Sequence, residues 1–300
     1  MNEVDWREHL DGRLVIASIS GGKDSAAMGL WLKENEIEHR RVFLDTGWEH
    51  MATYEYLRGP LTDALGPIEE ISGPLKMADL IRKKGMFPSR RRRFCTQELK
   101  VFPIQRYIKA LTEELEDEVV NTVGIRAEES MARSKMPEWE HSDSFDCEVW
   151  RPLIRWTEGD VVAIHAKHGL KPNPLYLRGA ERVGCWPCIY ARKKEIRMIA
   201  DTDPGTIDRI RNIEDEVAEL AAARYAKRGE TFESLNYLRP VWFQAPKGRQ
   251  GKPWLIDRVV EWSRTSYGGN QFELFAPDYA SEGCMRWGLC DTGEEPKDDE

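Results

Sequence analysis

The feature that most constrains the fold is a loop of small residues between an apolar strand and a helix. The apolar run 14–18 leads into the hexapeptide SGGKDS at 20–25, and the pattern after it predicts a helix over 24–34. Glycines remove side-chain bulk, so backbone N–H groups can close on an anion. The helix N-terminus adds unpaired N–H groups and partial positive charge. The sequence therefore predicts a phosphate-binding loop at the end of a strand.

This loop is not a Walker A motif, because the positions that need glycine and serine or threonine hold Ala17 and Asp24. It resembles instead the pyrophosphate loop (PP-loop) of ATP pyrophosphatases, which cleave ATP between its α- and β-phosphates and transfer the adenylyl group. The resemblance implies ATP and Mg²⁺ as cofactors. Asp24 is expected to hold the metal or to cap the helix. The expected phosphate ligands are Ser20, Gly21, Gly22, Lys23 and Ser25, with Lys23 exposed in the loop.

Strand and helix signals alternate through the first half of the chain. Strands are predicted at 14–18, 41–44, 68–71 and 119–123, and helices at 24–34, 50–65, 75–84 and 97–116, the last with a kink at Pro103. This order indicates an α/β fold, a doubly wound and mainly parallel sheet covered on both faces. In such sheets ligands bind at the carboxyl ends of the strands.

The chain is expected to divide into three regions. We expect a PP-loop domain over 1–200, a helical and aromatic-rich, cysteine-containing region over 201–290, and a disordered acidic tail over 291–300.

Two further strand ends carry candidate ligands. Asp45 follows the second strand, where an acidic residue can hold a ribose hydroxyl or Mg²⁺; a helix cap or turn is the alternative. After the fourth strand, Gly124 opens a segment with Arg126 and Arg133, which suit bidentate contacts with phosphate or sulfate. Ion pairs with the glutamates at 128–129 are the alternative for both arginines.

Composition and charge limit which partners the protein can bind and in which compartment it is expected. The 300 residues are 41% hydrophobic and carry a net charge of −8, which argues against nonspecific nucleic-acid binding by the whole surface. One basic run, Arg90–Arg93, is either a local nucleic-acid contact or a solvated loop. The N-terminus lacks the pattern of a signal peptide, and no apolar run reaches membrane-spanning length. We therefore expect a cytoplasmic protein without membrane contact.

The cysteines form a second signal. Cys185 and Cys188 make a C-x-x-C pair, Cys95 lies upstream, and Cys284 and Cys290 lie near the end. Such a set can hold zinc or an iron–sulfur cluster, and a redox pair or buried inert thiols are the alternatives. Without an export signal, disulfides are not expected. Cys147 stands between acidic residues, which disfavour a thiolate, so it is not expected to be a ligand.

Six motifs together resemble the phosphoadenosine phosphosulfate (PAPS) reductase superfamily over residues 12–200. They are, in order, SGGKDS, LDTGWEH, FCTQELKVFPI, GIRAEESMAR, WRPLIRWTEGDV and RVGCWPCIYAR. The resemblance implies an adenine nucleotide α-hydrolase-like fold and, with the extra cysteines, a [4Fe–4S] cluster. Cys95, Cys185 and Cys188 match family ligands, while Phe94 replaces one cysteine of the family's Cys-Cys pair. The fourth ligand is then expected at Cys290, with Cys284 as the alternative.

Departures from the family pattern favour one branch. Sulfonucleotide reductases carry a catalytic cysteine in a C-terminal Glu-Cys-Gly-x-His tail, whereas this chain has Glu-Gly-Cys-Met-Arg at 282–286 and no later histidine. The full SGGKDS loop suits ATP and its leaving pyrophosphate. The chain therefore looks most like the iron–sulfur sulfur-transfer proteins of bacterial DNA phosphorothioation.

This resemblance implies that ATP adenylates an oxygen of a substrate, which can belong to a nucleic acid, and that sulfur then displaces AMP. The sulfur would come from a donor protein such as a cysteine desulfurase. The expected catalytic residues are Lys23, Asp24, Asp45 and Arg126. A thioredoxin-dependent sulfonucleotide reductase and a non-catalytic nucleotide-binding module with structural zinc are the alternatives.

Overall fold

The computed structural model describes residues 6–116, 118–232, 234, 239–243, 253–266, 271 and 277–287. The tail predicted over 291–300 and Cys290 therefore lie outside the described residues. The strands are β1 Leu14–Ser18, β2 His39–Leu44, β3 Glu69–Ile71, β4 Val119–Val123, β5 Trp139–Ser142 and β6 Cys147–Trp150. The helices are α1 Trp6–Leu10, α2 Lys23–Glu34, α3 Met51–Tyr56, α4 Thr62–Leu65, α5 Met77–Lys84, α6 Phe94–Thr96, α7 Phe102–Leu115, α8 Glu158–Lys167, α9 Pro174–Leu177, α10 Lys193–Thr202, α11 Pro204–Ala226, α12 Ile256–Ser263 and α13 Tyr279–Trp287.

The strands form one sheet in the order β3-β2-β1-β4-β6-β5, parallel except for the edge strand β5. This confirms the predicted doubly wound, mainly parallel α/β fold. The sequence analysis did not predict β5 and β6. Each has four residues and carries charged or polar side chains, so neither shows a clear apolar period.

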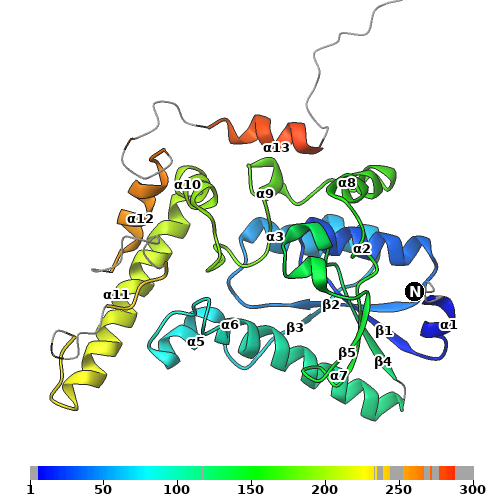
Figure 1. The fold of residues 1–300 in the computed structure, drawn as a ribbon, viewed down its shortest axis with the longest axis horizontal. Coiled ribbons are helices and arrows are strands. Elements are labelled where there is room, and N and C mark those ends of the chain that lie inside the picture. Colours follow the sequence, from blue (N-terminus) through cyan, green and yellow to red (C-terminus); the bar gives the residue numbers. More distant parts are fainter. Residues whose placement is uncertain are drawn as a thin grey trace, which may run out of the picture.

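The sheet is covered on both faces, as Figure 1 shows for α2 and α8 on one side and α7 on the other. Side chains of β1 alternate between these faces. Val15 and Ala17 belong to the core cluster that contains residues of α2 and α8. Ile16 belongs to the cluster that contains residues of α7. Because both faces are buried, the carboxyl ends of the strands remain the open edge for a site.

Two of the predicted helices contain a π-helical turn. The helix expected over 50–65 contains a π-helical turn at Leu57–Leu61, which includes Pro60. The helix expected over 97–116 begins at Phe94 and has a π-helical turn at Gln97–Val101. The junction residues Gln97 and Phe102 keep right-handed helical angles, so the helix is continuous from Phe94 to Leu115. Pro103 follows the π-helical turn, and the kink expected there stays a prediction.

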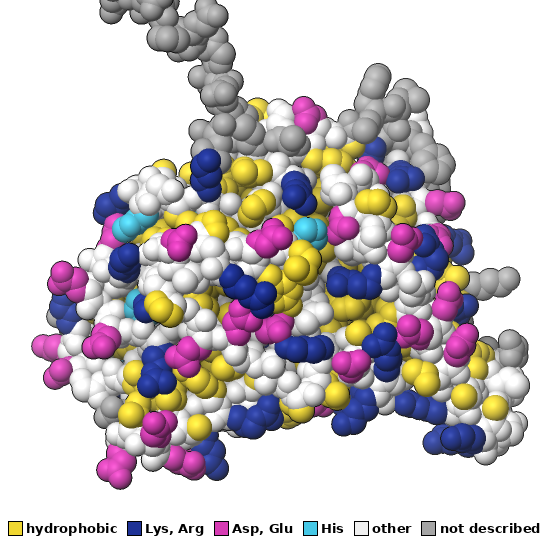
Figure 2. All heavy atoms as spheres, turned by 180° about the vertical axis from the view of Figure 1, so that it is seen from behind, with side chains coloured by type: hydrophobic (Ala, Val, Ile, Leu, Met, Phe, Trp, Pro, Cys, Tyr) yellow, Lys and Arg dark blue, Asp and Glu magenta, His cyan; other side chains and the backbone are white. Residues whose placement is uncertain are grey.

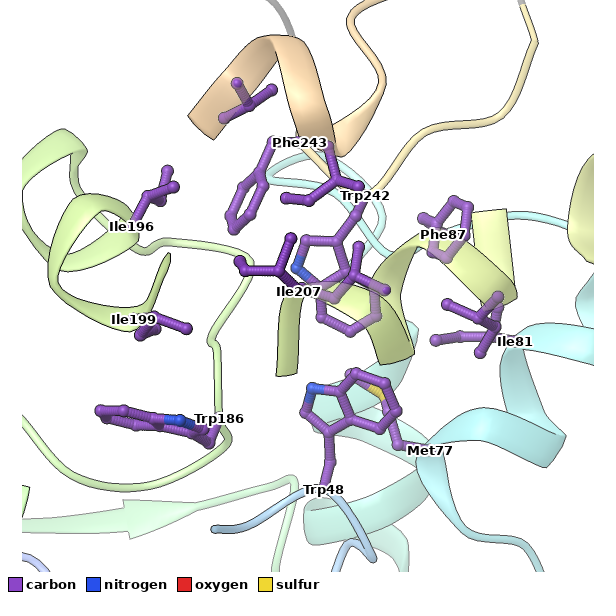
Figure 3. Packing of buried hydrophobic residues seen from close by; sticks show 14 of the residues in the cluster. Trp48, Met77, Ile81, Phe87, Trp186, Ile196, Ile199, Ile207, Trp242 and Phe243 are labelled. Carbon is purple, nitrogen blue, oxygen red and sulfur yellow. The ribbon is translucent and has the colours of Figure 1, made fainter. Parts of the chain in front are cut away.

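A second core joins the sheet domain to the helices α10, α11 and α12, which lie beside it in Figure 1. Figure 3 shows its centre, where Trp48 from the loop after β2 stacks on Trp242 with ring centroids 4.8 Å apart. Ile207 of α11 and Trp186 belong to the same cluster. The domain boundary predicted at residue 200 falls inside α10, and this core contains residues from both sides of it.

The surface carries both charges. On the face shown in Figure 2, basic and acidic side chains are interspersed rather than separated into two fields. Within the described residues, no helix has the length and apolar character that crossing a membrane requires.

Candidate nucleotide and cysteine site

The loop between β1 and α2 is held in shape by its own polar groups. Gly21 has a φ of +73°, a left-handed conformation that a side chain would strain. Ser25 Oγ accepts a hydrogen bond from the backbone N–H of Ser20 at 3.0 Å and lies 3.0 Å from the carbonyl oxygen of Gly22. No side chain caps the start of α2. The loop therefore leaves the helix N-terminus open, and its role in binding an anion stays a prediction.

The end of β4 lies directly against this loop. A Cβ atom on Gly124 would come within 2.7 Å of the carbonyl oxygen of Asp24. Glycine at this position therefore lets two strand ends meet. This contact brings the two predicted anion-binding segments together.

Lys23 is not exposed, so that expectation is wrong. Its side chain is 8% exposed, and its Nζ lies 2.7 Å from Oε1 of Glu158 at the start of α8. Nζ also donates to the carbonyl oxygen of Glu181 at 3.4 Å. Burial raises the pKa of Glu158, but the hydrogen bond and charge of Lys23 outweigh it, so the pKa lies below its usual value.

Asp24 and Arg126 form a buried ion pair beside the loop. The Arg126 side chain is 4% exposed, and its Nε donates to Oδ1 of Asp24 at 2.5 Å. Arg126 also pairs with Glu128, and Arg133 pairs with Glu129. Burial opposes the charged form of Arg126, but the two carboxylates raise its pKa. The ion pairing that the sequence left open as an alternative is therefore present for both arginines.

Asp45 lies beside the site rather than on its wall. Its carboxylate pairs with Lys76 and accepts hydrogen bonds from Tyr54 Oη at 2.6 Å and from the backbone N–H of Gly47 at 2.9 Å. Burial raises the pKa of Asp45, but these three donors together outweigh burial. The net pKa therefore lies below the usual value. The neighbouring Thr46 lines the cavity described next. A role of Asp45 in binding metal or ribose stays a prediction.

One cavity of about 340 Å³ runs from the loop to the cysteines. The loop contributes Ser20, Gly22, Asp24 and Ser25 to its wall, and the end of β4 contributes Gly124 and Arg133. The wall also contains three cysteines, the basic residues Arg93, Lys100 and Arg182, and the buried carboxyl of Glu195. The remaining wall residues are Thr46, Thr96, Leu99, Glu129, Tyr176, Val183, Gly184, Ile189 and Tyr190.

The three cysteines on this wall are Cys95, Cys185 and Cys188, all free and partly buried. Burial raises the pKa of Cys185 to about 11, and Glu49, whose Oε1 lies 3.9 Å from its sulfur, acts in the same direction. The charge of Cys185 in turn raises the pKa of Lys100, against the effect of burial. In the described ranges, no group of three or more His, Cys, Asp or Glu side chains is placed to hold a metal ion.

The other cysteines lie elsewhere. Cys147 is buried on β6 in the core under α7, and burial raises its pKa to about 11. Cys284 lies on α13. The expected fourth ligand, Cys290, lies outside the described residues.

The arginine run at 90–93 lies at the cavity's edge. All four side chains are exposed. In the part of the chain that the structure describes, none of them forms an ion pair with a carboxylate. The guanidinium groups of Arg90 and Arg93 lie 5.7 and 5.4 Å from the ring centroid of Tyr190. Arg93 and Tyr190 also line the cavity.

Several residues of the site were not predicted as functional. Lys100, Glu49, Glu158 and Tyr190 stand inside the quoted motifs, but sequence alone gave them no role. Tyr176 accepts a hydrogen bond from the backbone N–H of Lys23 at 3.0 Å. Neither it nor Glu195 had a signal in the sequence, because their roles come from tertiary contacts.

Comparisons with known proteins place this chain in a family. Residues 14–191 match the family described as the phosphoadenosine phosphosulfate reductase domain. The chain is 33% identical to an uncharacterised 37.8 kDa protein of Escherichia phage 186, covering 91% of this chain and 95% of that protein. It is 26% identical to the adenosine 5'-phosphosulfate (APS) reductase of Allochromatium vinosum, covering 59% of this chain and 68% of that protein.

Among solved structures, PAPS reductase from Candida auris in a phosphate complex aligns with a TM-score of 0.45 and 20% identity, over 58% of this chain and 82% of that chain. The family match spans more than half of the chain and includes both the phosphate loop and the C-x-x-C pair. The chain therefore belongs to the phosphoadenosine phosphosulfate reductase family and carries its nucleotide-binding domain.

Proposed function

We propose that the protein is an ATP-dependent enzyme that forms AMP and pyrophosphate and uses the activated intermediate for sulfur transfer. One observation carries the proposal: the phosphate loop and three cysteines line the same cavity. A nucleotide held by the loop would place its phosphates within the space that the thiols face. Adenylyl activation and sulfur delivery would then share one site.

In the first step, an acceptor oxygen would bond to the α-phosphorus of ATP. The bond from that phosphorus to the α,β-bridging oxygen breaks, and pyrophosphate leaves with the electron pair. Backbone N–H groups at 20–25 and the ammonium of Lys23 would stabilise the charge that develops on it. Asp24 is the better placed candidate for Mg²⁺, because it lines the cavity and Asp45 does not; it would exchange its ion pair with Arg126 for the metal.

In the second step, a sulfur nucleophile would displace AMP from the activated acceptor. The bond between the acceptor atom and the oxygen that carries the adenylyl group breaks, and AMP leaves with its electron pair. Arg126 and Arg133 would position the phosphate groups, as cations beside the loop. Arg133 pairs with Glu129 through Nη1, so its other N–H groups would be the ones that contact a phosphate.

The cysteines would hold a [4Fe–4S] cluster. Three thiols on one cavity wall, with a cationic lysine beside them, are the donor set and the charge that a cluster of this kind uses. Cys95, Cys185 and Cys188 would be ligands, with Cys290 as the fourth and Cys284 as the alternative. When bound, the cluster would supply or relay sulfur, or stabilise the fold. Zinc is the alternative occupant.

The acceptor would be a nucleic acid that the arginine run holds. Four exposed arginines without carboxylate partners in the described ranges suit a phosphate backbone, and the cavity opens beside them. The sulfur would come from a donor protein such as a cysteine desulfurase. A relation to DNA phosphorothioation is part of this proposal.

A sulfonucleotide reductase is the second candidate, favoured by the APS reductases among the relatives. One experiment separates the two. Anaerobically purified protein is incubated with ATP and Mg²⁺, or with APS or PAPS and reduced thioredoxin, and the products are identified by chromatography. AMP and pyrophosphate support our proposal. ADP and phosphate contradict it, and sulfite release supports the reductase. Binding without any product would indicate a nucleotide-binding module.

A further inference from the structure

Three polar groups of Lys23, its backbone N–H, its carbonyl oxygen and its ammonium, each contact a different residue. Its backbone N–H donates to Tyr176 Oη of α9 at 3.0 Å. Its carbonyl oxygen lies 3.1 Å from Nε2 of His165 on α8. Its ammonium lies 2.7 Å from Glu158, the first residue of α8. The lysine of the phosphate loop is therefore fixed from outside the loop.

The last turn of α13 contacts all three of these residues. The ring centroid of Trp287 lies 5.7 Å from that of Tyr176 and 5.2 Å from that of His165. Nε of Arg286 lies 4.0 Å from Oε1 of Glu158. Three of the polar contacts of Lys23 thus lead, each through one residue, to the same helical turn.

The docking of α13 is close. A Cβ atom on Gly283 would lie 2.4 Å from the carbonyl oxygen of Tyr176, so only glycine fits there. Trp287 is 6% exposed. Its Nε1 is buried and has no hydrogen-bond partner among the described residues. Figure 1 shows α13 lying across α9, far in sequence from the loop.

The Glu158 carboxylate competes with a phosphate for the same ammonium. The Lys23 side chain is 8% exposed and that of Glu158 is 42% exposed, so water screens this pair in part, from the side of Glu158. A polyphosphate bound to the loop needs the charge of Lys23 and is repelled by that of Glu158. Arg286 and Arg126 are further cations that act on Glu158, and Arg286, 4.0 Å away, can retain this carboxylate when Lys23 turns to a phosphate.

We propose that Glu158 and the last turn of α13 set the affinity of the loop for the phosphate chain of a nucleotide. Glu158 lowers this affinity by holding Lys23, and Arg286 raises it by drawing Glu158 away. Trp287 keeps Arg286 and the partners of Lys23 in place. These are positioning residues, because they act through Lys23. The inference rests on the proposed function only in that Lys23 binds phosphate.

The test is calorimetric titration of inorganic pyrophosphate with Mg²⁺ into the full chain. Glu158→Gln should tighten binding by about 3- to 10-fold, since it removes the competing charge. Arg286→Gln should weaken binding by about 2-fold. The double variant should bind like Glu158→Gln alone, because Arg286 acts only through Glu158. The Michaelis constant for ATP should follow the same order, while kcat changes little.

Two controls separate this effect from general loss of charge or of helix surface. Glu219→Gln removes an exposed carboxylate on α11, and Met285→Ala trims a side chain of α13 that is 63% exposed. Both should bind pyrophosphate like the unmodified chain. If that chain binds pyrophosphate but Glu158→Gln binds it equally or more weakly, the inference is wrong and the proposed function stands. If the unmodified chain binds neither pyrophosphate nor ATP, the proposed function also fails.

Discussion

At one end of the cavity, consecutive residues of a single loop form the predicted phosphate site, with glycine geometry and serine hydrogen bonds inside the loop. At the other end, Cys95 comes from α6 and the C-x-x-C pair from a loop before α10. The polar contacts inside the first end join residues of one loop. The second end depends on packing between distant segments, since Cys95 and Cys185 pack against the core shared with α10, α11 and α12.

The phosphate-loop end and the cysteine end differ in whether they need a bound group in order to form. The phosphate end should persist without its ligand, because bonds within the loop and contacts of Lys23 with Tyr176 and His165 already hold its conformation. The cysteine end brings thiols together whose pKa values burial raises, so an occupant that binds thiolates must offset this cost. Loss of a cysteine should therefore affect folding, whereas loss of the loop lysine should affect mainly chemistry.

Replacing either cysteine of the C-x-x-C pair should give the largest effect. In Cys185→Ser or Cys188→Ser, iron content should fall from about four per chain to none, and thermal stability should fall with it, because cluster binding is coupled to folding. Iron analysis and visible spectra of anaerobically prepared protein measure both. Cys147→Ser, the matched control in the α7 core, should keep its iron. Iron that disappears only from the Cys147 variant, or one zinc and no iron in the unmodified chain, contradicts this.

The same measurement identifies the fourth ligand. We expect Cys290→Ser or Cys284→Ser to lose iron as well, with Cys290 the first candidate. If both serine variants keep a full cluster, the fourth ligand is neither of them.

Replacing Lys23 should impair the reaction at the phosphate-loop end of the cavity. Lys23→Ala should slow formation of AMP and pyrophosphate by about 100-fold or more, since a preorganised cation on the leaving group is lost. Thermal stability should drop only slightly, because the partner Glu158 is 42% exposed and can turn to water. Lys33→Ala on the same helix should retain full activity. Equal rates for Lys23→Ala and the unmodified chain would show that the loop does not carry the reaction.

The arginine run should contribute less, and in a salt-dependent way. Changing all four residues of 90–93 to glutamine should weaken single-stranded nucleic-acid binding and lower the slope of log affinity against log salt by about 2 to 3. Paired changes at Arg106 and Lys109 on α7 should leave the slope nearly unchanged. The measurement is fluorescence anisotropy at several salt concentrations. If the slope does not change in the fourfold variant, these arginines form a solvated loop and do not contact the nucleic acid.

The smallest effect should appear at Glu195, a carboxyl on the cavity wall. Burial raises its pKa, against the opposing charge of Arg182, so the folded chain binds the proton more tightly than the unfolded chain. Its contribution to stability is therefore greatest below pH 4.5 and is lost as pH rises through the folded-state pKa. Glu195→Gln should unfold at a temperature higher by about 2 °C at neutral pH. If the difference in unfolding temperature between Glu195→Gln and the unmodified chain does not grow between pH 4.5 and 7, the raised pKa of Glu195 is contradicted.

The sequence predicted those parts that depend on neighbouring residues. Strands β1 to β4, the loop at 20–25 and the thiols on the cavity wall follow from apolar runs, glycines and short motifs. Strands β5 and β6 were missed because four-residue strands carry little pattern. The burial of Lys23 was missed because its partners Glu158 and Tyr176 lie more than a hundred residues away. The contacts of α13 are equally long-range, and local patterns carry no information about them.

The central claim is that the phosphate loop and the cysteines form one site. The most direct test is the visible circular dichroism of the anaerobically prepared protein during titration with pyrophosphate and Mg²⁺. The account predicts a saturable change in the cluster bands, at the concentration where calorimetry detects binding, and a much weaker response in Lys23→Ala. Cluster bands that stay unchanged while pyrophosphate saturates the protein would contradict it.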